Sequence, residues 1–449
     1  MEARYAARKS PLLDECQVAP EIFEQVMPRL EAFMKPFVST LQGQAGTRHA
    51  QTYVCGLLSN VERKNVESIA DRFGQSRLPL QDFIGCDTWD DAPLREELQG
   101  QIRRHLGQGD GVLVFDPSGF PKSGRESVGV ARQWCGRLGK VDNCQVAISL
   151  GYVSRQGHTL VDSRLYLPKE WTKETARLDK AGVPNTSRAY RTRHQLVLEM
   201  LAAHSAALPH RWIAGDDEMG RPSWFRRRLA ALNARYLLAV PSNTSIRDLE
   251  TALPESGRKG RRPARPWHSV QAWSQAVDAS AWQRLDVRDG AKGPLVVESV
   301  KRRVVSRNHR RQQGDEELLT VIRSRDRDQE KVVKVDYYLS NADPETPLWE
   351  LARVAKAEHR IEECLQRSKS EAGMADYEVR HWTGWQHHQT LSLLATWFLV
   401  RETARGKKMD PCDDPAADSS RHCRDLVRGL SLWDSGAYAG GTPEALATP

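Results

Sequence analysis

Two apolar segments of this sequence are each followed directly by an aspartate. Residues 111–115 (GVLVF) precede Asp116, and residues 212–215 (WIAG) precede Asp216. Both segments are typical of buried strands, and ligand sites in open α/β sheets gather at strand ends. Two ionised carboxylates held side by side repel each other unless a cation lies between them. The pair therefore predicts a divalent-cation site.

The cation that such a pair favours is Mg²⁺, with Mn²⁺ as a substitute. Mg²⁺ needs only one or two protein carboxylates and keeps its other positions for water and phosphate oxygens. Two such ions, about 3.5–4 Å apart, can activate a water and hold the leaving oxygen of a phosphodiester. The structural alternative is that Asp116 begins a turn and that Asp216 caps the following helix.

A third carboxylate is expected from a helix, and the segment 358–385 offers Glu362. Lys369 lies seven residues later, which is two helical turns, so the two side chains share a face. The carboxylate can then complete the metal site while the lysine binds a phosphate. Glu363 is the adjacent competitor. The alternative is a solvated Glu/Lys pair on a helix surface.

The N-terminal part of the sequence is predicted to be helical from residue 19 to about 106. The stretch 65–85 (NVESIADRFGQSRLPLQDFIG) reads as two short helices around a turn at Gly74. This is the outline of a helix-turn-helix, whose second helix can enter the major groove of DNA. Any helical hairpin with a glycine turn has the same outline, so a purely structural pair is the alternative.

From Gly111 onwards strand patterns appear and alternate with helices. Three strand candidates come first and a strand–helix–strand order follows, which outlines a mixed sheet flanked by helices. The predicted strands are 112–116, 145–153, 159–167, 211–217 and 235–243, and the predicted helices are 191–206 and 222–234.

Residues 244–345 interrupt this pattern and are predicted to form a β-rich insertion. Strand-like alternation occurs at 294–306, 317–326 and 331–341. Basic runs at 258–265 and 301–311 are candidates for phosphate contacts, with solvated loops as the alternative. Trp267, Trp273 and Trp282 follow the first run and can stack on an unpaired base or form a small core instead.

Composition limits the broad class of the protein. The formal net charge of +8 and the pI of about 9.1 favour a polyanionic partner. The eight cysteines show no zinc-ligand spacing, which indicates reduced thiols. The N-terminus lacks the apolar core of a secretory signal, and the apolar stretch 391–400 is too short to span a bilayer. We expect a cytoplasmic protein that does not bind membranes.

Several long segments resemble the DDE-type transposases of bacterial insertion sequences, in the RNase H-like DDE superfamily of endonucleases. Residues 115–152 resemble the first catalytic segment, and residues 162–184 continue the likeness. Residues 212–243 resemble the second segment and residues 360–399 the third. The likeness runs through most of residues 20–400, with the segments in the expected order.

The resemblance implies an α/β fold. Its parts are an RNase H-like mixed sheet with flanking helices, a β-rich insertion that interrupts this sheet, and an all-helical N-terminal domain before it. The predicted boundaries are 1–20 for a loosely ordered start, 21–108 for the helical DNA-binding domain, 109–243 for the first part of the catalytic core, 244–345 for the insertion, 346–402 for the helical end of the core and 403–449 for a disordered tail.

The family's catalytic triad falls on Asp116, Asp216 and Glu362, which would hold the metal ions. Asp217 is the neighbouring alternative to Asp216. The resemblance also implies double-stranded DNA as partner, namely the terminal inverted repeats and the target, a homodimer on that DNA, and a bacterial nucleoid location. The residues expected to contact DNA are Lys122, Arg360, Lys369, Arg302, Arg303 and Trp267.

Two positions depart from the family pattern around the last acid. Ala355 stands where a tyrosine is common, and Glu358 stands where an arginine is common. A transposase that has lost catalysis and only binds DNA is therefore the main alternative. A phosphatase with an aspartate nucleophile is a second alternative, but that class expects an acid where Ser118 stands.

Overall fold

The computed structural model describes residues 25–41, 43–253, 264–290, 293–308, 310–325 and 332–409 of the 449-residue chain. The predictions of a loosely ordered start over 1–20, of a tail beyond residue 409 and of most of the basic run 258–265 lie outside the described residues. Among the described residues, no helix is long and apolar enough to cross a membrane.

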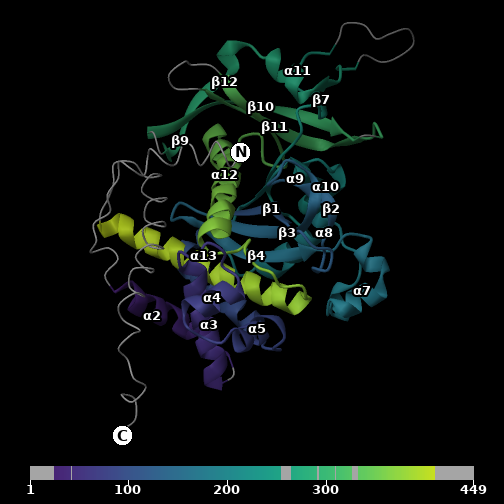
Figure 1. The fold of residues 1–449 in the computed structure, drawn as a ribbon. Coiled ribbons are helices and arrows are strands. Elements are labelled where there is room, and N and C mark those ends of the chain that lie inside the picture. Colours follow the sequence, from purple (N-terminus) through teal and green to yellow (C-terminus); the bar gives the residue numbers. More distant parts are fainter. Residues whose placement is uncertain are drawn as a thin grey trace.

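The described N-terminal part, up to residue 106, contains helices. In α2 the residues Val26, Leu30, Phe33 and Phe37 recur at intervals of three and four and are buried, as expected for one apolar face. The helices are α2 (Val26–Val38), α3 (Gly43–Leu58), α4 (Val66–Arg72), α5 (Arg77–Gly85) and α6 (Ala92–Leu106). Helices α2 to α5 lie in the lower part of the molecule in Figure 1.

Helices α4 and α5 correspond to the predicted helix-turn-helix. The Asn65 side chain accepts a hydrogen bond from the backbone N–H of Ser68 and so caps α4. Gly74 lies between the helices at φ 59°, a conformation that favours glycine. Leu78 at the start of α5 is 60% exposed. The hairpin is therefore formed, while its role in reading DNA stays a prediction.

Strands of the predicted core and of the predicted insertion belong to one continuous sheet. Among the described residues, the order is β2-β3-β1-β5-β6-β12-β11-β10-β7-β8, with β4 beside β3 and β9 beside β10. The core strands are β1 (Val112–Pro121), β2 (Ala131–Cys135), β3 (Lys140–Val153), β4 (His158–Tyr166), β5 (Trp212–Gly215) and β6 (Tyr236–Ala239). The remaining strands are β7 (Ser245–Asp248), β8 (His268–Ser269), β9 (Gln283–Gly290), β10 (Gly293–Arg307), β11 (Gln313–Arg325) and β12 (Val332–Ser340).

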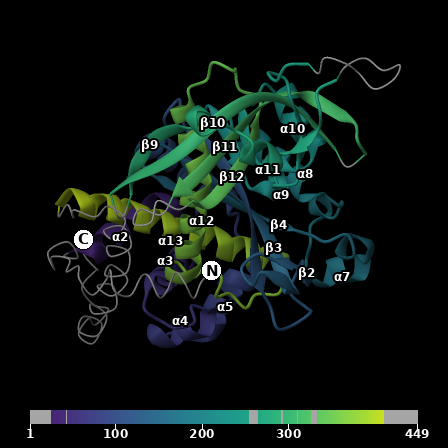
Figure 2. The ribbon, with the colours of Figure 1, turned by 90° about the horizontal axis from the view of Figure 1, so that it is seen from above.

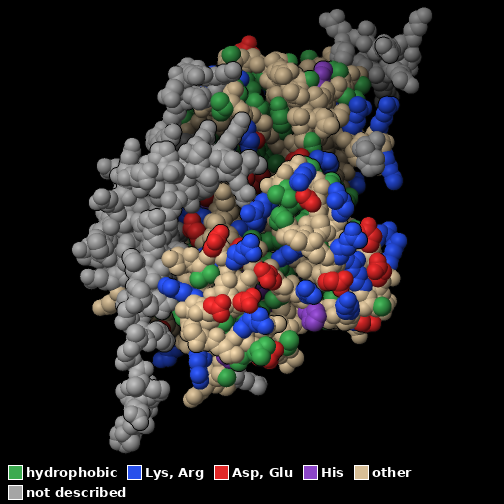
Figure 3. Space-filling model, in the orientation of Figure 1, with side chains coloured by type: hydrophobic (Ala, Val, Ile, Leu, Met, Phe, Trp, Pro, Cys, Tyr) green, Lys and Arg blue, Asp and Glu red, His purple; other side chains and the backbone are tan. Residues whose placement is uncertain are grey.

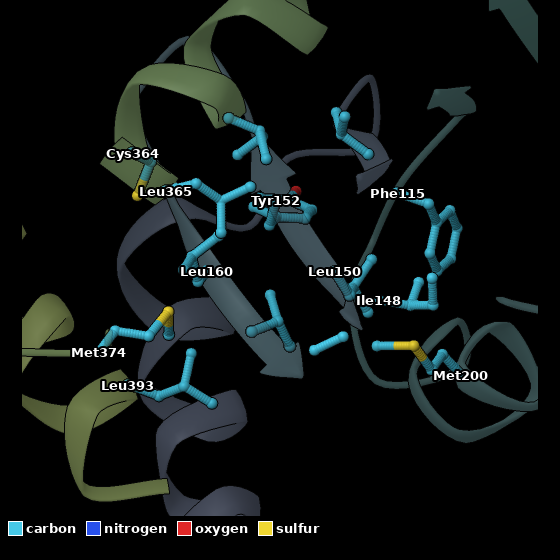
Figure 4. Packing of buried hydrophobic residues seen from close by; sticks show 14 of the residues in the cluster. Phe115, Ile148, Leu150, Tyr152, Leu160, Met200, Cys364, Leu365, Met374 and Leu393 are labelled. Atoms are coloured by element: carbon cyan, nitrogen blue, oxygen red, sulfur yellow. The ribbon is translucent and has the colours of Figure 1, made fainter. Parts of the chain in front are cut away.

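Helices cover both faces of the core strands. Figure 4 shows Cys364 and Leu365 of α12 beside Leu160, and Met200 of α8 beside Ile148. The helices after the first strands are α7 (Thr175–Lys180), α8 (Arg193–His204), α9 (Asp217–Gly220), α10 (Ser223–Ala231), α11 (Val270–Gln275), α12 (Leu348–Glu371) and α13 (Trp382–Met409). The predicted mixed α/β sheet with flanking helices is confirmed.

The insertion is β-rich, as predicted, but it does not form a sheet of its own. Its last strand, β12, pairs antiparallel with β6 of the core, and Figures 1 and 2 show β9 to β12 as an extension beside α12. A buried ion pair joins the two parts, since Arg226 of α10 donates to Glu317 of β11 at 2.7 Å. A small separate apolar core in the insertion includes Trp273.

The C-terminal helix is longer than predicted. The helical end of the core was expected to stop at residue 402, with a disordered tail from 403, but α13 continues to Met409. Residues 403–409 (TARGKKM) contain one glycine and good helix formers, so they extend the helix that precedes them.

Candidate active site

Asp116 and Asp216 lie next to each other in the sheet. Strands β1 and β5 are parallel, and their last paired residues are Phe115 and Gly215. Each aspartate is the residue that follows, and adjacent strands lie about 4.8 Å apart. Both carboxylates therefore project from the same face of the sheet at the same level.

Strand β1 does not end at Asp116, so that part of the prediction is wrong. It continues to Pro121 and stays paired with β3, with Asp116 opposite Ser149. What ends at this level is β5, whose chain turns into α9. Asp116 thus lies where β1 loses one of its two neighbouring strands.

Asp216 has a structural role as well. Its Oδ1 accepts a hydrogen bond from the backbone N–H of Met219 at 3.0 Å and caps α9. The capping alternative is therefore correct for Asp216, whereas Asp116 begins no turn. The cap fixes the orientation of the Asp216 carboxylate beside Asp116.

Burial and mutual repulsion make this pair hard to ionise. Burial is the main cause that raises the pKa of Asp116 to about 7, with Glu362 and Glu218 adding to it and Lys369 opposing it. Burial, followed by the charge of Asp116, raises the pKa of Asp216 to about 8. Among the described residues, none donates a hydrogen bond to the Asp116 carboxylate. Such carboxylates favour a nearby cation.

Helix α12 is fixed over this face by contacts along its length. The Trp212 indole donates to Glu350 Oε1 at 2.9 Å, and Lys301 donates to the carbonyl of Thr346, just before the helix, at 2.8 Å. Gly151 of β3 leaves room for Ile361, whose side chain occupies the position that a β-carbon at 151 would take. These contacts bring the acidic side chains of α12 towards the two aspartates.

Glu362, the predicted third acid, lies at the edge of the site. Its side chain is 58% exposed, and its Oε2 is 3.6 Å from Nδ1 of His359. The interaction with His359 holds the pKa of Glu362 below its usual value. Its charge raises the pKa of Asp116, so the two carboxylates interact across the site.

The acids next to Glu362 and Asp216 in the sequence form ion pairs with arginines. Glu363 pairs with Arg367 at 2.8 Å; although burial opposes it, the guanidinium lowers the pKa of Glu363 to about 2. Asp217 is exposed and pairs with Arg221 at 3.2 Å. The structure therefore favours Glu362 over Glu363 and Asp216 over Asp217.

Glu358 was not predicted as a site residue, yet the charges of both aspartates act on it. It lies one helical turn before Glu362 and is half-buried. Burial, then Asp216, Asp116 and Asp336, raise the pKa of Glu358 to about 8. The sequence signal that could have found it is the i, i+4 spacing of the two glutamates.

The two predicted phosphate-binding lysines differ in position. Lys369 interacts with Asp116, and its Nζ lies 5.3 Å from the centroid of the Phe120 ring. Lys122 lies about 20 Å further along β1 than Asp116. It donates to the carbonyl of Tyr377 at 2.7 Å, and burial lowers its pKa to about 8. Only Lys369 belongs to the site.

Of the other predicted DNA contacts, Arg302, Arg303 and Trp267 belong to the insertion and Arg360 belongs to α12. Arg302 pairs with Glu250 and Arg303 with Glu316, each at 2.7 Å. Trp267 stacks against two guanidinium groups, those of Arg247 at 4.5 Å and Arg307 at 4.7 Å. Arg360 is half-buried on α12. Figure 3 shows further Lys and Arg side chains, with some acids among them, over the side that carries α8 and α10.

The donor set fits a hard divalent cation by its chemistry, because carboxylate oxygens are ligands that Mg²⁺ and Mn²⁺ prefer. Of the three predicted ligands, only Asp116 and Asp216 lie close enough to each other to share a cation. Among the described residues, no group of three or more His, Cys, Asp or Glu side chains lies close enough to hold one ion. The predicted three-residue metal set is thus incomplete in this arrangement, and a glutamate of α12 has to turn towards the aspartates to complete it.

Comparison with known proteins shows the family of the chain. The family model of the DDE superfamily endonucleases matches residues 36–294, more than half of the chain, including both aspartates. A curated relative from Microchaete diplosiphon, "Probable transposase for insertion sequence element IS701", is 27% identical over 192 residues, which are 42% of this chain and 47% of the relative. The match thus covers about half the length of that relative. On the strength of the family match, the chain belongs to the DDE superfamily endonucleases.

Proposed function

We propose that this protein is a transposase that cleaves DNA at the ends of an insertion sequence and joins them to a target. The observation that carries the proposal is the side-by-side position of Asp116 and Asp216 on parallel strands. The family match and the insertion-sequence relative support the same activity.

Asp116, Asp216 and Glu362 are the residues that would hold Mg²⁺ or Mn²⁺. A divalent cation in such a site supplies a Lewis acid and lowers the pKa of a water. Asp216 is held by its cap on α9, and Asp116 by the pairing of β1 with β3, so the pair is oriented before substrate binds. Preorganisation of this kind lowers the cost of reaching the transition state.

Lys369 is placed to bind the scissile phosphate. Its ammonium group lies near Asp116, on the same flank of α12 as Glu362. A point charge there can hold a phosphate oxygen while a water, and later a 3′-hydroxyl of the cleaved strand, attacks phosphorus in line. No covalent bond between protein and DNA is needed for either step.

We assign the DNA contacts to surfaces outside the carboxylate site. The hairpin of α4 and α5 is proposed to read the terminal inverted repeats. Trp267, with the adjacent Arg247 and Arg307, is proposed to hold the flanking strand. A homodimer on the DNA would let two element ends be cut together. The chain covers only part of its relative, so these partners rest on the site and its surroundings.

The second candidate function is DNA binding without cleavage. The observations that favour it are the exposure of Glu362 and the acid at Glu358, where an arginine is common in the transposases that the sequence resembles. Both functions predict DNA binding that weakens with salt, so binding does not separate them.

Strand nicking separates the two candidates. Purified full-length protein is given labelled DNA that carries the sequences flanking its gene, with Mg²⁺ or with EDTA, alongside Glu362→Gln. The transposase proposal predicts cuts at the repeat ends that need Mg²⁺ and are lost in the variant. Binding without any cut by the wild-type protein would leave the DNA-binding candidate.

A further inference from the structure

Glu358 lies level with the two catalytic aspartates, whereas Glu362 lies one turn beyond them. The hydrogen bond from Trp212 of β5 to Glu350 of α12 places these two residues at the same level. Distances along the strand and along the helix are therefore counted from them. From there, eight helical residues to Glu358 cover about 12 Å. Four strand residues from Trp212 to Asp216 cover about 13 Å.

The far end of the helix confirms that α12 runs in the direction of β1 and β5. Lys369 lies near Phe120 of β1, and Val112 pairs with Trp212 at the starting level. The span from Glu350 to Lys369 is about 28 Å along the helix, and the span from Val112 to Phe120 is about 26 Å along the strand. Positions on α12 can therefore be compared with positions on the strands.

The charge of Lys334 favours the ionised form of Glu358, but burial and the nearby acids outweigh it. Asp336 of β12, another acid nearby, is paired with Lys334 at 3.1 Å and with Lys356 at 3.6 Å. Among the described residues, none forms a hydrogen bond or a close ion pair with Glu358. A half-buried carboxylate in this position, facing two aspartates, needs a cation to remain charged.

We propose that Glu358 is a fourth carboxylate of the active site and coordinates the divalent cation on the Asp216 side of the aspartate pair. This inference rests on the proposed function, because it requires a cation at Asp116 and Asp216. Glu362, which interacts with Asp116, then serves the other side of the pair. The acid at position 358 is then an additional cation ligand and not a sign that catalysis has been lost.

The test is Mn²⁺ binding by the full-length protein without DNA, measured by isothermal titration calorimetry. Glu358→Gln is compared with Glu363→Gln, an acid on the same helix whose charge is neutralised by Arg367. Asp216→Asn serves as the reference for loss of the site. We expect Glu358→Gln to weaken Mn²⁺ binding about 10-fold or more, because even the loss of an outer-shell group lowers metal affinity about 10-fold. We expect Glu363→Gln to bind Mn²⁺ with wild-type affinity.

The outcomes are distinguishable. Wild-type affinity in Glu358→Gln, together with loss in Asp216→Asn, would overturn the inference and leave the proposed function intact. A wild-type protein that binds no Mn²⁺ would overturn both. Circular dichroism and thermal unfolding check that each variant folds. If Glu358→Gln does not fold, Glu358→Asp replaces it, because aspartate keeps the charge and shortens the side chain by one methylene. Reduced Mn²⁺ affinity in the folded Glu358→Asp protein supports the inference. Wild-type Mn²⁺ affinity in that protein contradicts it.

Discussion

Gly151 of β3 lies directly against Ile361 of α12, and a β-carbon at position 151 would overlap the Ile361 side chain. This contact sets how closely α12 approaches the sheet, and with it the distance from the glutamates of α12 to Asp116. The absence of a side chain at one residue of β3 is thus a requirement of the active site.

Gly151→Ala is therefore expected to be destabilising and to impair nicking. Overpacking a closely packed core costs about 1–3 kcal/mol, and the displacement of α12 moves the acids away from the aspartates. Gly136→Ala is the control, since a β-carbon there meets nothing within 4 Å. Urea unfolding and nicking rates measure both effects, and a Gly151→Ala protein with wild-type stability and rate would show that the contact is not needed.

Asp162 is predicted to make the protein sensitive to acid. Burial opposes its ionisation, but the hydrogen bond from His204 and the charges of Arg164 and Arg95 hold the pKa of Asp162 well below its usual value. The unfolded chain binds this proton first, near pH 3.9, so the stabilisation is present above that pH and is lost as the pH falls.

Asp162→Asn should accordingly have a free energy of unfolding that falls less steeply below about pH 4. Urea unfolding at a series of pH values checks this. The control is Glu67→Gln, which removes an exposed ion pair with Arg77 and should leave the slope unchanged. An unaltered acid slope in Asp162→Asn would contradict the assignment.

The ion pair between Arg226 and Glu317 is predicted to join the insertion to the core. Glu317 also accepts hydrogen bonds from Tyr236 and Ser306, so Glu317→Gln leaves a buried guanidinium without its counter-charge. Removing one partner of a buried pair costs about 3–5 kcal/mol. Glu316→Gln, next to it on β11, breaks only an exposed pair with Arg303 and should cost less than about 1 kcal/mol. Equal stabilities of the two variants would refute the prediction.

Replacement of Lys369 is predicted to affect the nicking rate, and replacement of Lys122 is predicted to affect stability. Lys369→Gln should lower the nicking rate about 100-fold, as expected for loss of one group that stabilises charge in the transition state, with little change in the free energy of unfolding. Lys122→Gln should reduce stability, because it removes a buried contact with Tyr377. A stability loss confined to Lys369→Gln would reverse the two assignments.

The sequence predicted Asp116 and Asp216 because an apolar strand followed by an acid is a local pattern. It did not predict that β1 continues to Pro121, because the residues after Asp116, which include proline and glycine, are typical of loops, while the pairing with β3 is a tertiary effect. Lys122 was assigned to the site for the same reason, since a loop would have allowed it to return towards Asp116.

The position of the α12 acids could not be read from the sequence. Glu358 and Glu362 both fit a solvated helix face, and only the contacts of Glu350 and Ile361 with the sheet show which of them lies level with the aspartates. The continuity of the core and insertion sheets depends on the pairing of β6 with β12, about one hundred residues apart in sequence, which no local pattern contains.

The assignment of Asp116 and Asp216 as the catalytic centre is tested by comparing Asp216→Asn with Asp217→Asn in the Mg²⁺-dependent nicking assay. Asparagine keeps the cap on α9, so the comparison isolates the carboxylate charge at each position. We expect the nicking rate of Asp216→Asn to fall at least about 100-fold, which is above the range for outer-shell groups. We expect Asp217→Asn to nick DNA at the wild-type rate. Full nicking by Asp216→Asn, or a loss confined to Asp217→Asn, would contradict the assignment of the paired aspartates as the catalytic centre.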